Sequence, residues 1–146
     1  MLGKTVVNKG VSGSYSSYGA DTVNSVFSSH HPGYLLILYG VNDLIMDHSI
    51  DSVVNNLRAM IVAAKNNHTI PVIATLTPVF ASHAFVKNKV ITLNERIRLL
   101  ANELEIHVAD LENAFAWNTI YIGADGLHPN SAGHNLIATV FYEILQ

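Results

Sequence analysis

The chain contains the apolar stretch Tyr34-Leu35-Leu36-Ile37-Leu38-Tyr39, six residues with no charge and no helix breaker. A continuous apolar run of this length is typical of a parallel strand that is covered on both faces. A second run, Ile70–Leu76, ends at Thr77-Pro78, and a shorter one spans Ile106–Ala109. The three runs predict the buried strands of a parallel sheet.

Helical patterns alternate with these runs. Ser49 is a suitable N-cap, with Asp51 in the first turn, for a strong amphipathic helix that extends to about Asn67. Lys87–Leu104 predicts the next long helix. The other predicted elements are a strand over Lys4–Asn8, a loop over Gly10–Ser17, a weak helix over Asp21–Ser29, a helical turn around Ala114 and a last helix capped by Ser131.

Strands that alternate with helices indicate an α/β protein, here one domain over residues 1–146. The predicted architecture is a three-layer α/β/α sandwich with a mostly parallel sheet and right-handed connections. In such sheets, ligands bind outside the carboxyl ends of the strands. Candidate functional residues are therefore sought directly after the apolar runs.

The composition narrows the possible functions. Charged residues make up only 13% of the chain and apolar residues 49%, which favours buried strands and an exposed apolar surface used in association. The net charge of −3 gives no electrostatic reason to expect a nucleic-acid partner. The absence of cysteine excludes disulfides, and the histidines show no spacing typical of metal ligands, so no metal or other cofactor is predicted.

The sequence also bears on membranes and location. No apolar run reaches the roughly 18 residues of a membrane span, so none is predicted. The first residues lack the long apolar core of a secretory signal, which implies a cytoplasmic protein if Met1 is the native start.

The most informative polar motif is Asp125-Gly126-Leu127-His128, which precedes the last predicted helix. At this spacing a carboxylate can hold an imidazole by one ring nitrogen while the other faces a cleft. The imidazole could then act as a general base near neutral pH. A pair of this kind is, by itself, more often an ordinary surface turn, so the motif gains weight only from its neighbours.

Two further motifs follow predicted strands. Asn42, just after the central apolar run, could donate its side-chain amide to a developing oxyanion, although Asn and Asp are also common in turns. Gly10 and Gly13 could let backbone N–H groups approach a ligand closely, or could simply serve a turn. Because all three motifs lie at the carboxyl ends of strands or next to the last helix, we expect one shared site.

Together the three motifs resemble those of the SGNH, or GDSL, hydrolase family of esterases and lipases, from about Thr5 to the C-terminus. The resemblance implies a flavodoxin-like SGNH hydrolase fold and hydrolysis of small-molecule carboxylic esters. It also implies that Asp125 and His128 are two members of a catalytic triad. Asn42 and Gly13 would form the oxyanion hole.

One part of the family pattern is missing. The family's Gly-Asp-Ser-Leu block, which carries the nucleophile, precedes the glycine turn, whereas the seven residues before Asn8 contain no serine. We therefore expect an N-terminally truncated domain without the first strand and helix. A strand at Thr5–Asn8 would then pair directly with Tyr34–Tyr39, or an edge of the sheet would stay open. Open apolar edges attract other strands, so a homo-oligomer is predicted.

Three interpretations of this absence remain. The protein could still hydrolyse esters, with a substitute nucleophile (Ser12, Ser14 or Ser16) or a water molecule activated by His128. It could be an inactive scaffold that binds acyl or glycan ligands. It could also be a fragment of a longer esterase that folds through self-association.

Overall fold

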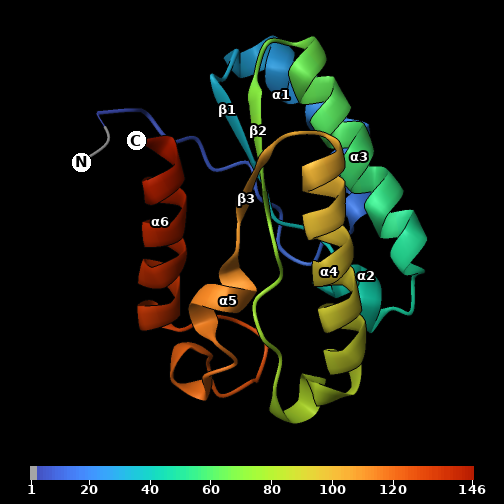
Figure 1. Ribbon diagram of the computed structural model, residues 1–146, viewed down its shortest axis with the longest axis vertical. Helices are drawn as coiled ribbons and strands as arrows, with labels where there is room; N and C mark the ends of the chain where they lie inside the picture. Colours follow the sequence, from blue (N-terminus) through green and yellow to red (C-terminus); the bar gives the residue numbers. More distant parts are fainter. Residues whose placement is uncertain (1–2) are drawn as a thin grey trace.

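The sheet lies at the centre of the computed structural model, which describes residues 3–146. Its three strands are parallel and occur in the order β1 (Tyr34–Ile37), β2 (Ile70–Ala74) and β3 (His107–Ala109) (Figure 1). Tyr34 is paired with Ile70, and Val72 with His107. The three strands predicted from the apolar runs are confirmed, although each is shorter than expected.

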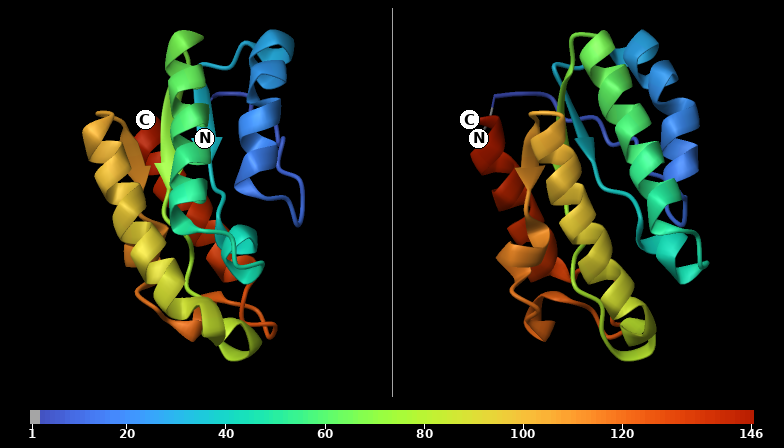
Figure 2. Two further views of the ribbon diagram at one scale, coloured as in Figure 1. Left: turned by 90° about the vertical axis from the view of Figure 1, so that its right-hand side faces the viewer. Right: turned by 45° about the vertical axis from the view of Figure 1, so that its right-hand side comes forward.

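Helices cover both faces of the sheet. α1, α3 and α4 lie on one side and α6 on the other, so the predicted three-layer α/β/α arrangement is observed (Figures 1 and 2). No helix within residues 3–146 is both long and apolar enough to span a bilayer. The helices are α1 (Ser16–His30), α2 (Val41–Ile45), α3 (Ile50–Asn66), α4 (Lys87–Glu103), α5 (Leu111–Phe115) and α6 (Ser131–Leu145), with short 3₁₀ helices η1 (Ala81–Val86) and η2 (Thr119–Tyr121).

Each face of the sheet has its own apolar cluster. Ile73 of β2 packs with Leu57 and Ile61 of α3, whereas its neighbour Val72 packs on the side of α6 with Phe115. Successive strand residues point to opposite faces, so a strand covered on both sides must be apolar at every position. This requirement explains why the strands appear in the sequence as continuous runs instead of alternating patterns.

The helix ends agree with the predictions in one case and differ in two. Ser49 caps α3 by accepting a hydrogen bond from the Ser52 N–H. For α6 the cap is Asn130, so the prediction of Ser131 was wrong by one position; both side chains can cap, and they are adjacent. α1 begins at Ser16, not at Asp21, because the Ser16 N–H finds a distant acceptor in the Asp43 carboxylate.

The predicted strand at Lys4–Asn8 is wrong. Residues 3–15 contain no strand, and Val6 and Val7 are exposed. The Lys4 ammonium donates to the Leu145 carbonyl at the end of α6 and lies over the ring of Tyr34, so this segment is held by side-chain contacts instead of a strand ladder. β-Branched residues favour a strand only where another strand pairs with them. Among the described residues β1 consequently pairs with β2 alone, and its outer edge has no strand partner.

Candidate active site

Asp125 and His128 form a hydrogen-bonded pair on the loop between η2 and α6. His128 Nδ1 lies 2.6 Å from Asp125 Oδ2, and Asp125 Oδ1 accepts the N–H groups of Leu127 and His128 at 3.0 and 3.1 Å. The pKa of the Asp125 carboxyl lies far below its usual range. The hydrogen bond to the His128 imidazole is the largest cause, and the two backbone hydrogen bonds come next. An ionised carboxylate can only accept, so Nδ1 carries the proton and Nε2 is left as the free ring nitrogen.

This pair is open to solvent. The side chain of His128 is 72% exposed and that of Asp125 47%. An accessible Nε2 whose partner nitrogen is fixed by a carboxylate can take a proton from a nucleophile or a water molecule. The hydrogen bond that the three-residue spacing predicts is therefore present, and the role of His128 as a general base stays a prediction.

Gly126 allows the loop to dock against the segment before η1. Its φ is +73°, and a Cβ at this position would lie 2.2 Å from the Phe80 carbonyl oxygen. The Phe80 N–H donates to the Gly126 carbonyl at 2.7 Å. Both the backbone conformation and the close approach require glycine here.

Asn42 lies in the first turn of α2. Its side-chain amide donates to the Ser14 carbonyl at 3.1 Å, which leaves the second amide hydrogen for another acceptor. The preceding Gly40 has a φ of +132°, and a Cβ there would lie 2.8 Å from Leu93. The turn after β1 is thus packed closely against α4, and it presents Asn42 next to the N-terminal loop.

The loop around Gly13 is a tight turn. The Ser14 N–H donates to the Val11 carbonyl at 3.2 Å, and Gly13 has a φ of +74°. Within residues 3–146 the Gly13 N–H has no acceptor. The bond from Asn42 to the Ser14 carbonyl therefore holds the Asn42 amide against the turn that carries the Gly13 N–H, the second candidate donor for an oxyanion.

The three candidate serines differ in accessibility. Ser16 is fully buried: its hydroxyl donates to Asp43 at 2.8 Å and accepts from the Asn56 amide at 2.9 Å, so no substrate can reach it. The Ser14 hydroxyl donates to the Val11 carbonyl, and Ser12 is exposed. In the part of the chain that the structure describes, neither Ser12 nor Ser14 is hydrogen-bonded to His128.

The two groups of site residues share a neighbour. We call them the oxyanion half (Gly13, Ser14 and Asn42) and the base half (Asp125 and His128). α2, which carries Asn42, packs against η1, and η1 in turn hydrogen-bonds to the Asp125 carbonyl. Leu127, between Asp125 and His128 in sequence, packs against the apolar cluster that contains Leu44 of α2. No hydrogen bond joins the two halves directly within residues 3–146.

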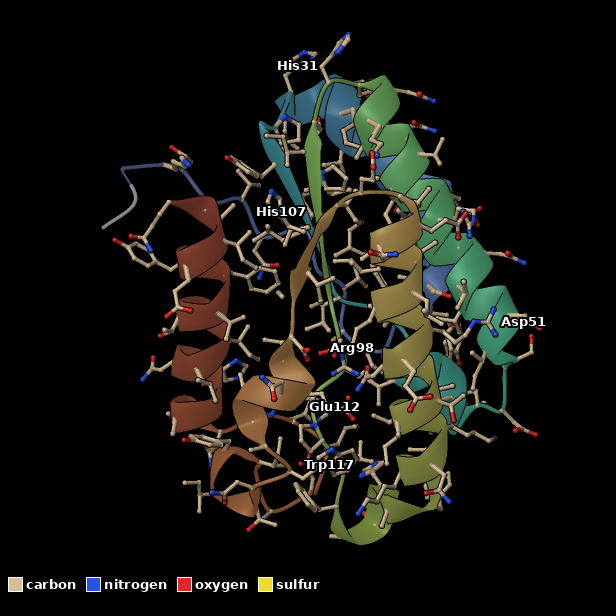
Figure 3. The ribbon with its side chains drawn as sticks, in the orientation of Figure 1. His31, Asp51, Arg98, His107, Glu112 and Trp117 are labelled. Atoms are coloured by element: carbon tan, nitrogen blue, oxygen red, sulfur yellow. The ribbon has the colours of Figure 1, made fainter. Side chains whose placement is uncertain are left out.

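A second polar cluster lies between α4 and α5. Arg98 binds Asp110 at 2.7 Å and Glu112 at 2.8 Å, and the Trp117 indole donates to Glu112 at 3.3 Å (Figure 3). The Asp110 hydrogen bond is the main cause of the raised pKa of Arg98. All of these groups are paired with one another, so the cluster joins helices and leaves no group free for chemistry. Among residues 3–146, no three His, Asp or Glu side chains are arranged to hold a metal ion.

Sequence reasoning did not identify the partners of the residues that support the site. Asp43 is buried and binds the Ser16 backbone and hydroxyl, and Asn56 of α3 completes this contact. Their partners are 27 and 40 residues away in sequence, so no local pattern reveals them. Ser82 and His83 of η1 are likewise distant from the loop that they bind.

Comparisons with known proteins place this arrangement in context. A family model described as the GDSL-like lipase/acylhydrolase family matches residues 1–136. No curated protein was found that matches the chain.

Several solved structures share the fold at low sequence identity. A GDSL-like lipase from Bacteroides thetaiotaomicron is 20% identical, with a TM-score of 0.84 over 95% of this chain and 74% of that one. A catalytic mutant of an acetylxylan esterase from Geobacillus stearothermophilus is 20% identical, with a TM-score of 0.82 over 96% and 71%. A phosphonate-inhibited esterase from Pseudoalteromonas is 18% identical, with a TM-score of 0.74 over 94% and 74%.

Proposed function

Because the chain belongs to the GDSL-like lipase/acylhydrolase family, we propose that it hydrolyses carboxylic esters with His128 as the general base. The observation that carries this proposal is the 2.6 Å bond between His128 Nδ1 and Asp125, which leaves an exposed Nε2 free. Nε2 takes a proton from the attacking group and returns it to the leaving alcohol. Asp125 keeps the imidazole in the required tautomer.

The oxyanion half stabilises the charge that develops on the ester carbonyl. The second amide hydrogen of Asn42 and the N–H of Gly13 are the two donors. One such donor can change the rate by roughly 10²–10³. Their proximity depends on the Asn42–Ser14 bond, which fixes the side-chain amide beside the turn.

The attacking group is either a serine of the N-terminal turn or water. Ser12 and Ser14 flank Gly13, so an ester bound to the Gly13 N–H lies close to both hydroxyls. Where water attacks instead, an oxyanion hole and binding alone give only roughly 10³–10⁴ over the uncatalysed reaction. We therefore expect weak turnover of short activated esters and none of long-chain lipids.

Hydrolysis of p-nitrophenyl acetate tests the proposal. His128→Ala and Asn42→Ala should each remove most of the enzyme-dependent rate. His30→Ala, which changes an exposed histidine at the end of α1, should leave the rate unchanged. Turnover that survives His128→Ala would overturn the assignment of the base. Binding of a non-hydrolysable ester analogue without any turnover would fit an inactive scaffold instead.

A fluorophosphonate probe followed by mass mapping identifies the nucleophile. Labelling of Ser12 or Ser14, lost in the corresponding Ser→Ala variant, would assign that serine. Ester turnover without any labelled serine would identify water as the attacking group. Ser16 itself should carry no label, because it is buried.

We also propose that the protein self-associates through the free edge of β1. This edge carries no charge, and Leu36 and Leu38 are exposed beside it. A second copy can pair with it through the same residues around a two-fold axis. Sedimentation at micromolar concentration should show a dimer that Leu36→Lys weakens, and a monomer for the unaltered chain would contradict the proposal.

A further inference from the structure

The side chain of His83, which belongs to η1, binds the turn that contains Asp125 and His128. His83 Nδ1 lies 2.9 Å from the Asp125 carbonyl oxygen, and the Ser82 hydroxyl donates to the same oxygen at 3.2 Å. A carbonyl oxygen can only accept, so His83 Nδ1 carries a proton and donates it. This proton is present in one neutral tautomer and in the imidazolium, so protonation of His83 does not break the bond.

The other bonds of the turn are mostly local. Both oxygens of the Asp125 carboxylate are occupied by groups of residues 127 and 128, and the Gly123 N–H donates to the His128 carbonyl. These bonds shape the turn but do not orient it relative to the sheet. Orientation comes from the segment around η1, through the Phe80 N–H to Gly126 and through the side chains of Ser82 and His83.

The position of His83 is itself defined. It lies in η1, and its ring stacks on Phe85 with centroids 6.5 Å apart and an interplanar angle of 29°. The same 3₁₀ helix packs against α2, which carries Asn42. His83 therefore connects the base half to the element that lies beside the oxyanion half.

We propose that His83 is a positioning residue, whose Nδ1–H holds the Asp125 carbonyl and thereby aims His128 Nε2 toward the Asn42 side of the site. This inference builds on the proposed ester hydrolysis and assigns His83 no contact with substrate. A base displaced by about 1 Å can lose about 10²-fold in rate. His83→Ala should accordingly lower kcat by about tenfold to 10²-fold with little change in KM.

The matched variant is His83→Asn, since an asparagine amide can place an N–H close to the position of imidazole Nδ1. It should recover most of the lost kcat. His30→Ala controls for the loss of an exposed histidine elsewhere. Circular dichroism and thermal unfolding show whether each variant folds. If His83→Ala does not fold, the comparison of His83→Asn with the unaltered protein still tests the inference.

A second readout does not need activity. Hydrogen exchange at the Phe80 N–H, which donates to the Gly126 carbonyl at 2.7 Å, reports how firmly the turn is docked on the segment before η1. His83→Ala should speed this exchange and His83→Asn should restore the rate of the unaltered protein, whereas the local Asp125–His128 bond, with its Nδ1–H tautomer, should persist in every variant. This pattern without any turnover would refute ester hydrolysis but retain the role of His83. An unchanged Phe80 exchange rate in His83→Ala, or an equal change in His30→Ala, would overturn the inference.

Discussion

The two halves of the site are supported in opposite ways. The oxyanion half rests on a buried network in which Asp43 is 2% exposed and binds Ser16 by two hydrogen bonds. The base half is an exposed turn whose bonds are local or come from η1. Buried polar groups are costly to leave unpaired, whereas exposed pairs contribute little to stability. Changes to the buried network beneath the first half should therefore destabilise the protein, and changes to the second half should mainly affect catalysis.

The largest effect should come from Asp43→Ala. It removes the acceptor of the Ser16 N–H and hydroxyl, and the buried donors are left without partners. We expect the free energy of unfolding to fall by about 3 kcal/mol, measured by urea denaturation.

The control is Asp51→Ala. Asp51 is exposed in the first turn of α3 and pairs with Arg96 at 2.9 Å (Figure 3). This change should cost less than about 1 kcal/mol. Equal losses for Asp43→Ala and Asp51→Ala would mean that burial of the network is not what stabilises the oxyanion half.

Gly126→Ala should have the next largest effect. The added Cβ meets the Phe80 carbonyl at 2.2 Å in a backbone conformation that alanine rarely adopts. We expect a loss of about 2 kcal/mol in stability, and a larger relative loss of esterase rate because the turn must move. Gly13→Ala also lies at positive φ but meets no atom within 4 Å, so it should cost less in stability. A milder effect for Gly126→Ala than for Gly13→Ala would contradict the docking of the turn.

Asp125→Asn should change stability least and activity most. The folded-state pKa of Asp125 is lowered, so its carboxylate stabilises the fold above the unfolded value of about 3.9 and loses this contribution as the pH falls through the folded value. Asp125→Asn should therefore differ slightly in stability from the unaltered protein at pH 7, and the difference should shrink below about pH 4 and vanish only when the pH lies below the folded-state pKa. Esterase turnover should fall by about 10²-fold or more. Turnover equal to that of the unaltered protein would show that Asp125 does not orient the base.

The sequence was informative where local rules decide the outcome. The strands at Tyr34–Ile37 and Ile70–Ala74 follow from continuous apolar runs, and the Asp125–His128 bond follows from a three-residue spacing. Predictions from the sequence failed where the contacts of a segment come from residues far along the chain. Lys4–Asn8 has strand-forming residues but pairs with no strand, and α1 starts early because the Asp43 carboxylate accepts the Ser16 N–H from another element.

The central claim is that Asn42 and His128 act on one reacting carbonyl. A double-mutant cycle tests it, with the second-order rate constant for p-nitrophenyl acetate measured in the unaltered protein, Asn42→Ala, His128→Ala and the double variant. Residues that serve one transition state are strongly non-additive. We expect each single change to cost about 10²-fold or more, and the double variant to lie within about threefold of the slower single variant. Losses that multiply in full, or a single variant that keeps the original rate constant, would contradict a shared site.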